Sequence, residues 1–85
     1  MRSAAGDRVT FRLRPVHGAR GLDAATAERI GRVTGADGFD LRADGSAAFD
    51  FDRASDAATI RGHLEMAARF ELGAHWHTRY EVVGE

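Results

Sequence analysis

Two kinds of hydrophobic periodicity alternate along this chain, and their order constrains the fold more than any other feature. Apolar residues at every second position indicate strands, whereas apolar residues spaced three or four apart indicate helices. The first half of the chain is expected to contain a strand from Arg8 that Pro15 ends, and then a helix between Asp23 and Gly35. A hairpin with arms Phe39–Leu41 and Phe49–Phe51 follows. The last expected elements are a helix from Ser55 or Asp56 to Leu72, before Gly73, and a strand from about His75 to Val83.

This βαββαβ order, with right-handed crossovers, predicts an α+β fold. We expect a ferredoxin-like sandwich in which a four-stranded antiparallel sheet, in the order 4-1-3-2, carries both helices on one face. The chain has 85 residues, too few for two cores, so residues 8–85 are expected to form one domain. Residues 1–7 are small and polar and are expected to be flexible.

The apolar positions also predict which side chains form the core. Leu22, Thr26, Ile30 and Val33 form the expected stripe of the first helix, and Ala57, Ile60, Leu64, Ala67 and Ala68 form that of the second. A three-residue hairpin loop, Asp44-Gly45-Ser46, pairs Leu41 with Phe49 and Phe39 with Phe51. Phe11, Phe39, Phe49, Phe51 and Tyr80 then face the core, which argues against RNA recognition by aromatic residues on the open sheet face.

Composition excludes several classes of function. The net charge is −1, and a general nucleic-acid binder would carry a concentrated positive surface. The absence of cysteine excludes disulfides and thiolate chemistry. No apolar run reaches the roughly 20 residues that span a bilayer, so we expect no membrane partner and a cytoplasmic location. All 12 basic residues are arginine, a bias typical of a high-GC bacterium.

His75 and His77 are candidate metal ligands. Two histidines that are two apart on a strand project to the same side, where neutral imidazoles can share a zinc ion. A third ligand is not evident, so two half-exposed histidines on a polar sheet face are the simpler interpretation.

Glu71 falls within the apolar stripe of the second helix, and His63 lies two turns earlier on its edge. A carboxylate among apolar groups is a candidate general acid or base. Together with Trp76 and Tyr80, these residues predict a small-molecule pocket between helix and sheet. The alternative is that Glu71, in the final helical turn, is simply solvated.

His17-Gly-Ala-Arg-Gly21 leads into the first helix, where backbone amides and Arg20 could hold an anion. Its spacing matches neither a Walker loop nor a dinucleotide fingerprint, so we expect no cofactor and regard a plain connecting loop as the simpler interpretation.

The outer face of the expected sheet is charged. Arg12 and Arg14 are predicted to form cross-strand ion pairs with Asp50 and Asp52, and this face and the sheet edges are candidate association surfaces. Met66 lies off the apolar stripe beside Phe70 and would also suit a partner surface.

Three functions stay open at this point. The first is a non-catalytic interaction module, a homodimer or an accessory or effector-associated domain. The second is a cofactor-independent oxygenase, isomerase or cyclase of the dimeric α+β-barrel type that uses His63 or Glu71. The third is a metal or anion binder at His75 and His77.

Overall fold

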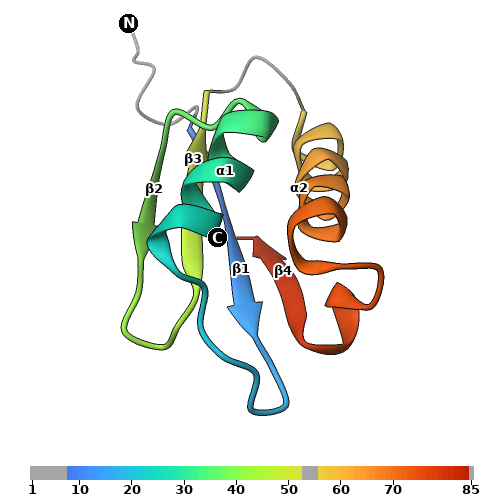
Figure 1. The fold of residues 1–85 in the computed structure, drawn as a ribbon. Helices are drawn as coiled ribbons and strands as arrows, with labels where there is room; N and C mark the ends of the chain where they lie inside the picture. Colours follow the sequence, from blue (N-terminus) through green and yellow to red (C-terminus); the bar gives the residue numbers. More distant parts are fainter. Residues whose placement is uncertain (1–7, 53–55, 85) are drawn as a thin grey trace, which may run out of the picture.

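The computed structural model describes residues 8–52 and 56–84. These residues form a four-stranded antiparallel sheet in the order β2-β3-β1-β4, with both helices packed on one face (Figure 1). The predicted α+β architecture with two helices on such a sheet is therefore confirmed. The elements are β1 (Val9–Pro15), α1 (Ala24–Thr34), β2 (Gly38–Leu41), β3 (Ala47–Phe51), α2 (Ala57–Leu72) and β4 (Tyr80–Gly84). Residues 1–7, expected to be flexible, and Ser55 lie outside the described ranges.

Both helices begin and end at the residues that the sequence indicates. The Asp23 side chain accepts a hydrogen bond from the Thr26 amide at 2.7 Å, and Gly35 adopts the left-handed conformation that ends α1. Asp56 accepts the corresponding bond from the Thr59 amide at 2.8 Å, and α2 ends before Gly73. Each cap satisfies an amide that would otherwise lack a partner in the first helical turn.

The core lies between the helices and the inner face of the sheet. Phe49, Leu13, Ile30 and Leu64 are its largest fully buried apolar side chains. Burying a side chain of this size stabilises the fold by about 1.5–3 kcal/mol. The predicted parity of the strands is confirmed, because Phe11, Phe49, Phe51 and Tyr80 are all buried on this side. Phe39 remains 38% exposed because β2 is the edge strand.

The hairpin register differs from the prediction. Leu41 pairs with Ala47 and Phe39 with Phe49. The loop has three residues, as expected, but they are Ala43-Asp44-Gly45, since the Arg42 amide donates to the Ser46 carbonyl at 2.8 Å. Gly45 takes a positive φ of 89°, the conformation that this kind of loop requires near its end. The observed pairing of β2 with β3 is shifted by two residues from the predicted one. Because side chains alternate with a period of two, each stays on its predicted face of the sheet.

The last strand begins later than expected. Residues Trp76–Thr78 form a short 3₁₀ turn, and β4 starts at Tyr80. Local hydrogen bonds hold this turn, including those from the Trp76 amide to the Gly73 carbonyl and from the Thr78 amide to the His75 carbonyl. The prediction of a strand from His75 is therefore wrong.

The apolar stripe of α1 also differs. Ala27, Ile30 and Gly31 face the core, whereas Val33 is 66% exposed. A weakly apolar helix of 11 residues could turn either of two faces toward the core. The Phe49 ring lies close to Gly31, and this packing selects the face that carries Ala27, Ile30 and Gly31.

Candidate functional site

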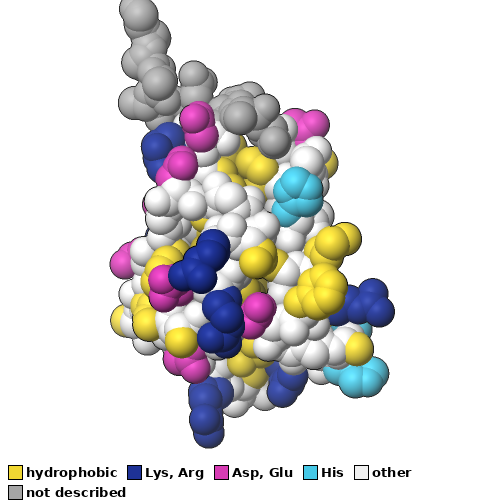
Figure 2. All heavy atoms as spheres, turned by 45° about the horizontal axis from the view of Figure 1, so that its top comes forward, with side chains coloured by type: hydrophobic (Ala, Val, Ile, Leu, Met, Phe, Trp, Pro, Cys, Tyr) yellow, Lys and Arg dark blue, Asp and Glu magenta, His cyan; other side chains and the backbone are white. Residues whose placement is uncertain are grey.

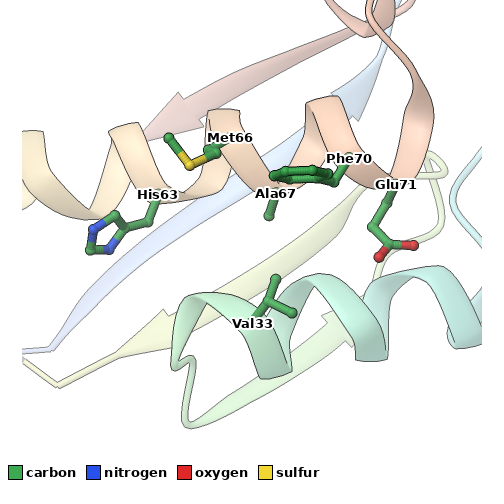
Figure 3. A pocket seen from close by; sticks show the side chains of 6 residues that line it. All are labelled: Val33, His63, Met66, Ala67, Phe70 and Glu71. Carbon is green, nitrogen blue, oxygen red and sulfur yellow. The ribbon is translucent and has the colours of Figure 1, made fainter.

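An apolar groove runs between α1 and α2 on the side that faces away from the sheet (Figure 3). Its volume is about 480 Å³. Helix α2 contributes most of the lining, and Val33 points into the groove from α1. The lining residues are Val33, His63, Met66, Ala67, Phe70 and Glu71.

Large apolar side chains stand exposed along this groove. Phe70 is 83% exposed, Val33 66% and Met66 61%. At 3.6 residues per turn, Met66 lies roughly 160° around α2 from the buried Leu64. Helix α2 therefore has two apolar faces, one in the core and one in solvent. Figure 2 shows hydrophobic side chains gathered beside a histidine on the side of the molecule where α2 lies.

Ionisable groups occupy the two ends of the groove. Glu71 points toward α1 and accepts a hydrogen bond from Arg29 Nε at 2.8 Å, which raises the pKa of Arg29 above its ordinary value. His63 lies two helical turns away, a separation of about 12 Å along the axis. The two side chains are too far apart to act on a single bond of a small substrate, and Glu71 is already engaged in an ion pair.

Trp76 and Tyr80 do not line this groove. Tyr80 is buried under the β1–α1 loop, where its hydroxyl donates to the Arg20 carbonyl at 2.7 Å, and Trp76 is half-buried against the core. The groove therefore does not unite them with His63 and Glu71, whose side chains line it on the side of the helices that faces away from the sheet.

Comparison with models of protein families, with curated proteins and with solved structures found no match. Within the described ranges, neither helix is long and apolar enough to cross a bilayer.

Arg20 is exposed in the loop before α1. The helix N-terminus beside it already holds the Asp23 carboxylate, and the hydrogen bond from the Thr26 amide lowers the pKa of Asp23 below its ordinary value of 3.8. A resident negative charge disfavours a second anion there. The anion site stays a prediction with no contact that supports it.

His75 and His77 lie in the turn before β4, so the strand alternation that would have placed them side by side is absent. The His77 ring contacts the edge of Trp76, with centroids 6.1 Å apart. Among residues 8–52 and 56–84, no three His, Asp or Glu side chains are grouped closely enough to hold a metal ion.

The outer face of the sheet carries a charged layer, but its pairs differ from those predicted. Arg14 pairs with Glu81, which lies directly opposite on β4. Arg12 contacts Asp44 at 3.1 Å, and Asp50 accepts a hydrogen bond from Thr10 at 2.7 Å because the register sets Thr10 opposite Asp50. Asp52 is exposed just beyond β3.

Sequence reasoning placed Val33 in the core and therefore missed the α1 side of the groove. The α2 side had a signal, since Met66 and Phe70 fall outside the buried stripe of that helix. We call the exposed side chains of Val33, Met66 and Phe70, with His63, the helix-face patch.

Proposed function

We propose that this domain is a non-catalytic protein-interaction module that associates through the helix-face patch. Its role would be that of a homodimerising accessory or effector-associated domain in the cytoplasm of a high-GC bacterium. The observation that carries the proposal is the exposure of Phe70, Val33 and Met66 along one continuous groove.

Burial energetics support this surface over the outer sheet face. Covering an exposed Phe, Val or Met contributes about 1.5–3 kcal/mol each before the entropy of association is subtracted. The exposed ion pairs of Arg12 and Arg14 contribute roughly 0–1 kcal/mol each and are already formed within the chain. A partner on the sheet face would have to replace them, whereas a partner on the helix-face patch gains apolar contact. The sheet face, with Arg12, Arg14, Asp50 and Asp52, stays a second predicted surface.

Substitution of Phe70 tests the proposal. Phe70→Ser and Met66→Ser should each weaken association about five- to thirtyfold without loss of the fold, because both side chains are exposed in the isolated domain. The measurement is light scattering after size-exclusion chromatography over a range of concentrations, with pull-down for other partners. Leu41→Ser, which changes a half-exposed residue on the edge strand β2, is the matched control. Equal association of all three variants and the wild type would contradict the proposal.

A small-molecule site in the same groove is the second candidate function, because His63 and Glu71 both line it. An enzyme of the dimeric α+β-barrel type would use one of them alone, given their separation. A ligand that shifts the NMR resonances of both residues in a chain that stays monomeric would favour this alternative. Metal binding by His75 and His77 has no comparable support.

The fold can also be assigned more finely as part of this proposal. Read from the β4 edge, the strand order is β4-β1-β3-β2, which agrees with the order expected of a ferredoxin-like sandwich. Domains of this architecture serve many functions, so the assignment does not itself select one.

A further inference from the structure

The exposed face of α2 has an arrangement that is symmetric about Met66. Phe70 lies four residues after Met66 and Gly62 lies four residues before it. Each is therefore about 6 Å from Met66 along the axis and about 40° to either side of it. Phe70, the largest exposed side chain of the helix, and Gly62, which has no side chain, thus lie at equivalent positions on opposite sides of Met66.

Nothing among the described residues of the isolated domain explains Gly62. It lies inside α2, it is exposed, and a Cβ atom added there would meet nothing within 4 Å. Glycine in a helix interior is less favourable than alanine, so the monomer would be more stable with a side chain at this position. A neighbour that needs the space would account for its absence.

We infer that a second copy of this chain occupies the helix-face patch, with the two α2 helices antiparallel across a two-fold axis at Met66. This inference rests on the proposed function and names its partner. A crossing angle of about 50° aligns the rows of residues four apart on two packed helices, and at that angle this isologous contact brings residue 70 of one copy opposite residue 62 of the other. The Phe70 ring then fills the space over the partner's Gly62, twice in each dimer. The two Met66 side chains meet at the axis, where their flexibility lets them pack side by side.

Charge supports a copy of the same chain as the occupant. Around the patch, Arg29 pairs with Glu71, Arg32 with Glu28 and Arg61 with Glu65 within each copy. The net charge of −1 leaves little repulsion between two copies, and these three pairs neutralise part of the charge around the patch.

A specific dimer would use more of the surface than the face of α2 alone. A standard interface takes about 800 Å² from each partner, roughly 15% of the 5162 Å² surface of this domain. Helix α2 has 16 residues, so its face is about 24 Å long, and the adjoining face of α1 widens it.

A cross-linking experiment tests the axis directly, because the chain has no cysteine. Helices packed at 8–10 Å would bring the two Cα atoms of residue 66 to roughly 4–5 Å, close enough for a disulfide. Met66→Cys should therefore form a covalent dimer under mild oxidation at micromolar concentration. Asp40→Cys, an exposed position on β2, is the control and should remain mostly monomeric. Equal cross-linking of the two variants overturns the inference.

A matched pair of glycine substitutions tests the contact. Gly62→Gln should raise the dissociation constant of the dimer about thirtyfold, because the new side chain occupies the space for Phe70. Gly38→Gln makes the same chemical change on the sheet edge, where the added Cβ also meets nothing within 4 Å, and should leave the constant unchanged. Both variants should keep the circular dichroism spectrum of the wild type.

The outcomes separate this inference from the proposed function. If Phe70→Ser abolishes self-association but Gly62→Gln does not, the helix-face patch is used in another arrangement and the two-fold at Met66 is wrong. If the wild type stays monomeric at millimolar concentration yet binds another protein through Phe70, the inference of a second copy as the partner is wrong, and the proposed function stands. If no variant of the patch changes any association, both fail.

Discussion

Gly21 and Gly45 meet where the loop after β1 crosses the β2–β3 hairpin turn. A Cβ atom on Gly21 would lie 2.8 Å from the Gly45 Cα atom and 3.1 Å from its carbonyl oxygen. The Leu22 amide donates to the Gly45 carbonyl at 3.1 Å in the same place. Contact between two backbones leaves no flexible side chain that could move away, so this crossing requires glycine.

Gly21→Ala should therefore destabilise the domain by about 1–3 kcal/mol, because one of the two loops must shift. The measurement is urea unfolding at a concentration where the chain is monomeric. Gly62→Ala is the matched control, since its Cβ meets open space, and it should instead stabilise the domain by up to about 1 kcal/mol. Similar unfolding midpoints for the two variants would contradict this account.

The helices depend on carboxylates at their first residues. Hydrogen bonds from the Thr26 and Thr59 amides lower the pKa values of Asp23 and Asp56 below their ordinary value of 3.8. A carboxylate with a lowered pKa binds its proton less readily in the folded state than in the unfolded state. The stability that it adds is thus complete above the unfolded pKa and is lost as the pH falls through the lower, folded pKa.

Replacing both capping aspartates by asparagine should flatten the acid limb of the stability profile. Asparagine keeps the cap but does not titrate. We expect the thermal midpoint of the wild type to fall more steeply than that of the double variant as the pH drops below 3.8. Circular dichroism melts at several pH values measure this. The hydrogen bond from the Ser46 hydroxyl also lowers the pKa of Asp44, which is present in both proteins. A smaller dependence of the thermal midpoint on pH should therefore remain in the double variant. If the thermal midpoints of the two proteins fell in parallel with pH, the capping aspartates would be excluded as the source of the acid sensitivity.

The whole molecule has a small core and a second apolar face. A domain of this size buries only about two-thirds of the surface that its unfolded chain exposes, so its own stability is modest. Association through the helix-face patch would bury more apolar area and would couple folding to concentration.

The thermal midpoint of the wild type should therefore rise with protein concentration. For a folded dimer that unfolds to separate chains, each tenfold increase adds about 1.4 kcal/mol to the free energy of unfolding per dimer. The midpoint of Phe70→Ser should not change over the same range. Differential scanning calorimetry at several concentrations measures both, and a wild-type midpoint independent of concentration would exclude a dimer coupled to folding.

Local features of the sequence were sufficient for the elements and their faces. Asp23 and Asp56 before the helices, the glycines after them, and the parity of Phe11, Phe49 and Phe51 predicted what the structure contains. The hairpin loop was misplaced by one residue because several turns suit the same alternation, and the site of Gly45 within the loop decided among them. His75 was assigned to a strand because Trp76 and Tyr80 fit strand parity as well as they fit a turn.

The sequence by itself determined which side chains could be buried, since hydrophobic periodicity depends only on the geometry of single helices and strands. It also indicated that Met66 lies off the buried stripe of α2 and that Phe70 lies along its edge. Only the tertiary structure decided that Val33 joins them, because the face that α1 turns outward depends on how it packs over the sheet. The same packing separated His63 and Glu71 from Trp76 and Tyr80. It is the relative placement of two helices, which neither helix encodes alone, that creates the helix-face patch.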